Sequence, residues 1–166
     1  IFLRWNRIIT LQEYKIPTHR KITSDKFHRD FIKIAEGETN KSSDWWRQVG
    51  AVIIGDRIIN PLTAFNHHLP NEQSSYVNGD PRSIFKPGEH IEMSLAIHAE
   101  ASVICRAANK GVSLSGTSLY VTTFPCPVCA RLILESGIKK VYYHHGYSRL
   151  DAKDILESGE VQMFHI

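Results

Sequence analysis

The stretch from His98 to Cys129 reads HAEASVICRAANKGVSLSGTSLYVTTFPCPVC, and its periodicity changes along its length. Residues 101–110 carry apolar side chains at helical spacing, Gly111 can end the helix, and residues 117–123 alternate as a strand does. About 12 helical residues cover ~18 Å at ~1.5 Å each, and about seven strand residues cover ~23 Å at ~3.3 Å each. The strand can therefore return to the start of the helix. We expect His98 and Cys126 to meet there, although 27 residues separate them.

Three side chains at the two ends of this stretch are candidate metal ligands. His98, Cys126 and Cys129 offer an imidazole and two thiolates, which zinc prefers, and a catalytic zinc takes three protein ligands. Pro127 suits the first position of a second helix, which places Cys126 at the N-cap and Cys129 on the first turn. The positive end of that helix favours anionic thiolates. The pattern therefore predicts one bound Zn²⁺.

The carboxyl group of Glu100 lies close to one of these ligands in the sequence and helps to distinguish a catalytic from a structural metal site. Glu100 follows His98 by two residues, which is not the i+4 spacing of a second helical ligand, and we assign to it the transfer of protons. A C-x-x-C pair alone also fits structural zinc, a redox pair or two core cysteines. A structural site has no use for the H-x-E carboxylate, so the combination favours catalytic zinc.

Segments on both sides of these motifs carry a family resemblance. They are residues 49–53 (VGAVI), 65–66 (FN), 97–101 (IHAEA), 119–131 (LYVTTFPCPVCAR) and 136–143 (SGIKKVYY). H-x-E followed by P-C-x-x-C is typical of zinc nucleobase deaminases. From about Trp46 to the C-terminus, the chain resembles the deoxycytidylate (dCMP) deaminase branch of the cytidine deaminase superfamily.

The resemblance implies a substrate site around the metal. Asn66 matches the residue that contacts the sugar, and backbone groups of Ala99 and Phe124–Pro125 match those that hold the pyrimidine edge. Tyr143 and Tyr147 match in kind the aromatic residues that wall the base pocket. A turn-capping asparagine and core or rim tyrosines are the plain structural alternatives.

Residues 67–93 form a long polar insertion with three prolines, and such a stretch inside a domain is usually functional or disordered. By the resemblance it helps to enclose a nucleotide, and His68, Arg82 and Lys86 are possible phosphate contacts. Solvated loop charges are the alternative. Some family members hold a second structural zinc here, but the absence of cysteine from this stretch argues against one.

The expected reaction is the hydrolytic deamination of a cytosine nucleotide, dCMP to dUMP. Glu100 would take a proton from the attacking water, pass it to N3 of cytosine and help to protonate the departing ammonia. Another zinc deaminase, acting on free cytidine, guanine or a base in RNA, is the alternative enzyme. A structural-zinc module that scaffolds or binds nucleic acid is the alternative outside enzymes.

Composition bounds the class of protein. The 166 residues are 42% hydrophobic with a net charge of +3, which suits one domain and a small-molecule nucleotide substrate but not a large nucleic-acid track. No run approaches the ~18 apolar residues of a membrane helix. Of three cysteines two are assigned to zinc, and we expect Cys105 in the core and a reducing compartment, the cytoplasm. The resemblance also implies that the protein is a homo-oligomer.

The periodic segments together predict an α/β fold with three layers and a central mixed sheet of five strands, the cytidine deaminase-like fold. We expect residues 1–23 to be an N-terminal extension and residues 24–166 to form a single zinc-dependent domain. The expected strands are 49–54, 57–66, 117–123, 139–143 and 161–164, and the expected helices are 24–37, 101–110, 128–135 and 149–157.

Overall fold

A mixed β-sheet forms the centre of the molecule in the computed structural model, which describes residues 21–85, 90, 93–146 and 151–166. Within these residues the sheet has six strands in the order β1-β8-β7-β6-β2-β3. They are β1 (Lys21–Ile22), β2 (Gly50–Ile54), β3 (Leu62–Phe65), β6 (Ser118–Thr123), β7 (Lys140–His145) and β8 (Gln162–His165). Strands β6, β7, β8 and β1 pair in parallel, and β2 runs antiparallel to both of its neighbours.

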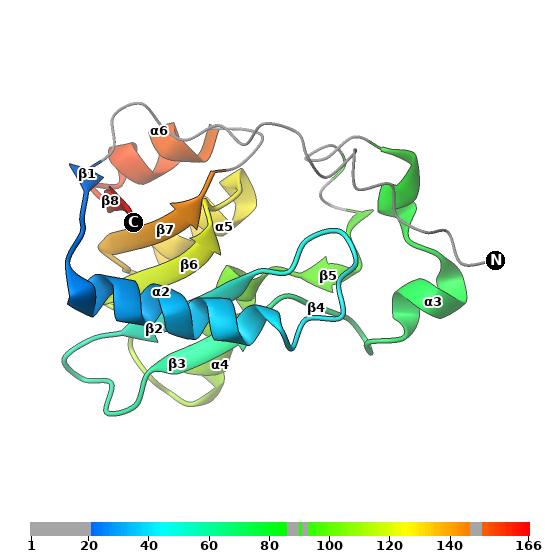
Figure 1. Ribbon diagram of the computed structural model, residues 1–166, viewed down its shortest axis with the longest axis horizontal. Helices are drawn as coiled ribbons and strands as arrows, with labels where there is room; N and C mark the ends of the chain where they lie inside the picture. Colours follow the sequence, from blue (N-terminus) through cyan, green and yellow to red (C-terminus); the bar gives the residue numbers. More distant parts are fainter. Residues whose placement is uncertain (1–20, 86–89, 91–92, 147–150) are drawn as a thin grey trace.

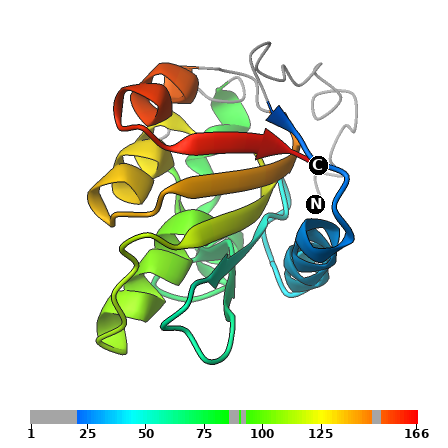
Figure 2. The same ribbon diagram turned by 90° about the vertical axis from the view of Figure 1, so that its left-hand side faces the viewer.

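Helices cover both faces of this sheet, as Figure 2 shows. Helices α4 (Ala99–Asn109), α5 (Pro127–Glu135) and α6 (Asp151–Ser158) lie on one face, and α2 (Lys26–Thr39), in blue, lies on the other. The three layers and the mixed sheet confirm the predicted fold class. In the described chain, no helix is long and apolar enough to cross a membrane.

The five expected strands are all present with shifted ends, and β1 is a sixth. It falls within the segment expected as an extension and pairs with β8 through Lys21 opposite Phe164 and Ile22 opposite His165. The first helix also differs from expectation. Its N-cap is Asp25, whose side chain accepts from the backbone N–H of Phe27, and it continues to Thr39.

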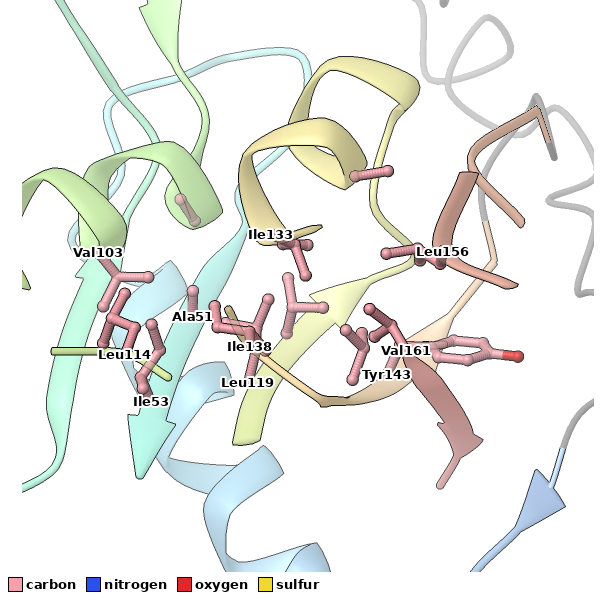
Figure 3. Packing of buried hydrophobic residues seen from close by; sticks show 14 of the residues in the cluster. Ala51, Ile53, Val103, Leu114, Leu119, Ile133, Ile138, Tyr143, Leu156 and Val161 are labelled. Carbon is pink, nitrogen blue, oxygen red and sulfur yellow. The ribbon is translucent and has the colours of Figure 1, made fainter. Parts of the chain in front are cut away.

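Two groups of buried side chains hold the layers together. The larger lies between the sheet and helices α4, α5 and α6, and Figure 3 shows Leu119, Ile133 and Leu156 within it. The smaller lies under α2 and contains Tyr120 and Tyr142. Because side chains alternate along a strand, β6 contributes Leu119 to one group and Tyr120 to the other.

Helix α2 comes very close to the start of β2. A Cβ atom on Gly50 would lie 1.8 Å from the carbonyl oxygen of Ala35, which no side chain can tolerate. Glycine at position 50 therefore lets the helix pack directly on the backbone of the strand. The chain between α2 and β2 therefore lies at the end of the sheet where β6 ends, because β2 and β6 are antiparallel neighbours.

The stretch 67–93 contains more regular structure than the sequence predicts. Strand β4 (His67–His68) pairs with β5 (Ala96–Ile97), and α3 (Ser74–Asn78) and the 3₁₀ helix η1 (Pro81–Ile84) follow within the stretch. These elements lie to one side of the main sheet in Figure 1. The short β4–β5 pairing joins the start of the insertion to the strand that leads into His98.

Candidate active site

Two helices begin at the same place and present their first residues to one another. His98 is the N-cap residue of α4, and Cys126 is the N-cap residue of α5 with Pro127 in the first turn. The Cys126 sulfur accepts a hydrogen bond from the backbone N–H of Cys129 at 3.5 Å. The structure thus confirms that the helix and strand between these motifs bring both ends together.

The three candidate ligands have the spacing of a zinc site. The Nδ1 atom of His98 lies 3.4 Å from the sulfur of Cys126 and 3.4 Å from that of Cys129. Zn–N and Zn–S bonds of ~2.05 and ~2.3 Å at a tetrahedral angle place nitrogen and sulfur ~3.6 Å apart. All three donor atoms lie within 4.8 Å of one another, and the described chain holds no other such group of three or more. The residues therefore fit zinc.

The ionisation of the two thiols is divided unequally between them. The side-chain hydrogen bond with Cys129 is the main cause that lowers the pKa of Cys126 to about 4, and His98 adds to it. The same side-chain hydrogen bond and burial raise the pKa of Cys129 well above its ordinary value. Cys126 is therefore the more acidic thiol of the pair. Zinc binds cysteine as the thiolate, so metal binding releases protons from this site.

Glu100 lies in the first turn of α4 and is buried, with 4% of its surface exposed. Burial is the main cause that raises the pKa of its carboxyl group, and the nearby Cys126 adds to the rise. His98 and a hydrogen bond with Cys129 act in the opposite direction. A carboxyl group with a raised pKa beside a metal ligand is suited to take up and release a proton.

Asn66 lies just after β3, and both polar atoms of its side chain form hydrogen bonds within the protein. Its Oδ1 atom accepts from the backbone N–H of Val49 at 2.7 Å and from the hydroxyl of Ser42 at 2.9 Å. Its Nδ2 atom donates to the carbonyl oxygen of Arg47 at 2.7 Å. These contacts match the structural alternative of a turn-capping asparagine. The contact to a sugar stays a prediction.

The residues expected around the base are buried beside the zinc ligands. Phe124 is 1% exposed and packs edge-to-face on Tyr143 at 4.9 Å between ring centroids. Tyr143 itself is fully buried in the larger core, as Figure 3 also shows, and Ala99 is fully buried at the start of α4. Pro125 is buried as well. Tyr147 lies outside the described residues.

The possible phosphate contacts are not gathered into an open basic site. His68 is 1% exposed, and its Nδ1 atom lies 3.2 Å from the hydroxyl of Ser43. Arg82 pairs with the carboxylates of Asp44 and Asp80 at 2.9 and 2.6 Å. Lys86 lies outside the described residues. Phosphate recognition by these side chains stays a prediction.

Comparison with known proteins identifies the family. A model of the cytidine and deoxycytidylate deaminase zinc-binding region matches residues 25–145. The chain belongs to this family. The match covers strands β2, β3, β6 and β7 of the main sheet, both zinc-motif helices and the insertion, so the matched region makes up most of the chain.

Several relatives of this chain carry the name deoxycytidylate deaminase. The protein from Enterobacteria phage T2 is 42% identical over 72 residues, which are 42% of this chain and 38% of the relative. A probable deoxycytidylate deaminase of Drosophila melanogaster is 38% identical over 111 residues, 62% of this chain and 51% of the relative. The chain thus spans about two fifths to one half of these relatives.

A solved structure supports the same fold for this chain. The dCMP deaminase of cyanophage S-TIM5, crystallised with dCMP and dUMP, superposes with a TM-score of 0.66 at 25% identity. The superposition covers 87% of this chain and 99% of that protein. This likeness agrees with the three-layer arrangement described above.

The sequence did not reveal the polar network that surrounds Asn66 and Asp44. The Ser42 hydroxyl bonds to Asn66, and Asp44 accepts from the backbone N–H groups of Trp46 and Arg47. Short polar residues that cap backbone groups two or three positions on are a recognisable signal. The pattern Ser42-Ser43-Asp44 could have predicted a capped turn, but not its partners in the insertion.

Proposed function

We propose that this protein catalyses the hydrolytic deamination of a cytosine nucleotide, with dCMP as substrate and dUMP as product. The observation that carries the proposal is the cluster of His98, Cys126 and Cys129 with the buried carboxyl group of Glu100 beside it. The relatives named deoxycytidylate deaminase support this choice of substrate, as does the cyanophage enzyme that was crystallised with dCMP and dUMP.

The proposed chemistry assigns one proton carrier to several steps. When bound to His98, Cys126 and Cys129, the zinc ion supplies Lewis-acid activation of the attacking water. Glu100 accepts the proton released by that water and delivers it to N3 of cytosine, which makes C4 electrophilic. After water has added at C4, Glu100 takes the proton of the new C4 hydroxyl group and passes it to the amino group. The C4–N bond then breaks, ammonia leaves and the C4 carbonyl group of the product forms. The raised pKa of Glu100 supports this role, because the carboxyl group must hold a proton between steps.

The proposed substrate contacts come from the elements that surround these groups. Backbone groups at Ala99 and Phe124–Pro125 would hold the pyrimidine edge, since they flank Glu100 and Cys126 in the chain. Asn66 would contact the sugar through the donor capacity that its Nδ2 atom keeps beyond its bond to Arg47. Tyr143 and Tyr147 are proposed to support or wall the base pocket. We propose that the insertion provides the selectivity for phosphate, with His68 and Lys86 as its candidate groups, while Arg82, the third residue considered, is assigned another role below.

The experiment is a deamination assay across a panel of substrates. Purified zinc-loaded protein would be tested with dCMP, CMP, deoxycytidine, cytidine, guanine and an RNA hairpin, by ultraviolet absorbance and ammonia release. We expect the highest kcat/KM for dCMP. Turnover of guanine or RNA alone would retain the zinc chemistry and refute the substrate. A protein with full zinc content and no turnover of any of the six would refute the reaction.

Three further properties belong to this proposal. We propose a homo-oligomer, by resemblance to the family, and light scattering of the purified protein tests it. We propose the cytoplasm as the compartment, because a reducing compartment keeps both zinc-binding cysteines available. We also propose that residues 24–166 act as one deaminase domain, which limited proteolysis would test as a single resistant fragment.

A further inference from the structure

Four consecutive residues between α2 and β2 each hold a side chain of the insertion. We call residues 43–46 the fastening strip. Its contacts are the Ser43 hydroxyl with the Glu72 carboxylate, Asp44 with Arg82 at 2.9 Å, the Trp45 Nε1 with the Tyr76 hydroxyl at 2.7 Å, and the Trp46 Nε1 with Asp80 at 3.0 Å. The partners span residues 72–82, so the insertion is attached along much of its described length.

Asp44 connects this attachment to the active site. Its side chain is buried, and its Oδ1 atom accepts from the backbone N–H groups of Trp46 at 2.7 Å and Arg47 at 3.2 Å. Its Oδ2 atom accepts from Nη1 of Arg82. The carbonyl oxygen of Arg47 in turn accepts from Nδ2 of Asn66 at 2.7 Å. One carboxylate therefore links the insertion to the backbone that orients Asn66.

Asn66 is placed to transmit this link to the catalytic residues. It directly precedes β4, and β4 pairs with β5, the strand that leads into His98. In the register of this pair, His67 lies opposite Ile97. Continued by one residue, the same register brings Asn66 opposite His98. A displacement of the fastening strip would therefore shift Asn66 next to the zinc ligand His98.

Arg82 is committed to this attachment by both its geometry and its charge. Its Nε and Nη2 atoms donate to Asp80 as a fork at 3.0 and 2.6 Å, its Nη1 atom donates to Asp44, and the guanidinium lies 5.8 Å from the Trp46 ring centroid. Its side chain is 20% exposed. Two carboxylates around one guanidinium, of which that of Asp44 is buried, leave a net charge of −1, which repels a phosphate group.

We infer that Arg82 is a positioning residue for the deamination reaction. With Asp44 and Asp80 it fastens the insertion to the loop that orients Asn66, and it does not bind the phosphate. The inference rests on the proposed function, since it names what sets the affinity of that same site for its substrate. Because the attachment acts through Asn66 and the backbone, deoxycytidine and dCMP depend on it equally.

The test compares Arg82→Met, Asp44→Asn and the double variant with the wild type. Asn at position 44 keeps an oxygen for the backbone N–H groups of Trp46 and Arg47 but loses the charge that attracts Arg82. We expect KM to rise about 10- to 100-fold for both dCMP and deoxycytidine, with little change in kcat or zinc content. The KM of the double variant should be no higher than that of the single variant with the larger rise, because both substitutions remove the same link.

Three matched variants make the comparison specific. Arg82→Lys keeps the charge but cannot form the fork, so it should restore only part of the affinity. Asp80→Asn should reproduce the rise in KM from the other side of the guanidinium. Arg57→Met removes an exposed arginine from the turn between β2 and β3 and should leave both substrates unaffected. If Arg82→Met fails to fold, Arg82→Lys and Asp80→Asn carry the test.

The possible results separate this inference from the proposed function. A loss confined to dCMP would show direct phosphate contact and overturn the inference, as would additive effects in the double variant or unchanged KM values. The affinity of dUMP and deoxyuridine, measured by calorimetry in the same proteins, gives the same comparison if the wild type proves inactive. An inactive wild type would refute the proposed reaction, while a parallel loss of both affinities would still support the role of Arg82.

Discussion

Replacement of Glu100 by glutamine should separate zinc binding from catalysis. The amide has the shape of the carboxyl group, which is 4% exposed, so the fold and the ligands His98, Cys126 and Cys129 should be retained. Proton transfer by a positioned group contributes about 10²–10⁴-fold, and each factor of ten corresponds to ~1.4 kcal/mol of barrier. Because Glu100 is proposed to serve both N3 and the leaving ammonia, we expect a loss near 10⁴-fold in kcat, about 5.5 kcal/mol.

The assay is dCMP turnover at saturating substrate, with zinc content measured by elemental analysis on the same preparation. The conservative Glu100→Asp variant keeps a carboxyl group but withdraws it by one methylene, so it should retain more activity than Glu100→Gln. A glutamine variant with full zinc content and most of the wild-type rate would refute the assignment. The proton carrier would then be another group.

Four further predictions test the ligands, the substrate and the fold. Cys129→Ala should lose both zinc and activity, and full zinc occupancy by elemental analysis would contradict the ligand assignment. The wild type should favour dCMP over deoxycytidine by about 10- to 150-fold in kcat/KM, since a charge-assisted contact to phosphate contributes ~1.5–3 kcal/mol; equal values would contradict it. Gly50→Ala should lower the free energy of unfolding by about 1–3 kcal/mol in urea titrations, because its Cβ would meet the Ala35 carbonyl oxygen. Gly37→Ala, which meets nothing within 4 Å inside α2, is its matched control and should gain about 0.5–1 kcal/mol. Burial opposes the ionisation of Asp80, but hydrogen bonds from Arg82 hold its pKa below the usual 3.8. The ion pair therefore stabilises the fold above pH 3.8, and this stabilisation is lost as the pH falls through the lowered pKa. The stability difference between wild type and Asp80→Asn should therefore shrink on acidification, and a constant difference would contradict this pairing.

The layers and the zinc ligands were predictable because their signals are local and periodic. The segment from Ala99 to Thr123 contains a helix and a strand of matched lengths, and this match is enough to bring His98 to Cys126. Pro127 and the two cysteines then fix the start of the next helix. Hydrophobic alternation likewise located the strand around Val121, and a short apolar run located the strand around Val52; both valines are buried.

Short pairings and single positions were predicted less well. Strand β1 and the β4–β5 pair have two residues per strand, and two residues carry no periodicity. The first helix was expected to begin at Ser24, but Asp25 is its N-cap residue, because its carboxylate accepts from the N–H of Phe27. Cys105 was expected in the core, yet it is exposed, because α4 turns Val103 and Ala107 toward the sheet instead.

Contacts between distant polar residues were beyond sequence reasoning. Asp44 and Arg82 are 38 positions apart, and no pattern in either segment indicates that they meet. Arg82 was therefore considered only for its charge, as a possible phosphate contact. The pairing with two carboxylates becomes visible only when the turn before β2 and the 3₁₀ helix η1 are placed side by side.

The fastening strip also makes the protein spectroscopically informative. The chain has three tryptophans, of which Trp5 lies outside the described residues, and the other two are Trp45 and Trp46 of the strip. The first donates its indole N–H to a tyrosine hydroxyl and the second to a carboxylate beside a guanidinium. Indole fluorescence responds to such neighbours, so detachment of the insertion should change the emission spectrum. Nucleotide binding and the attachment of the insertion could then be followed together, in real time and without a label.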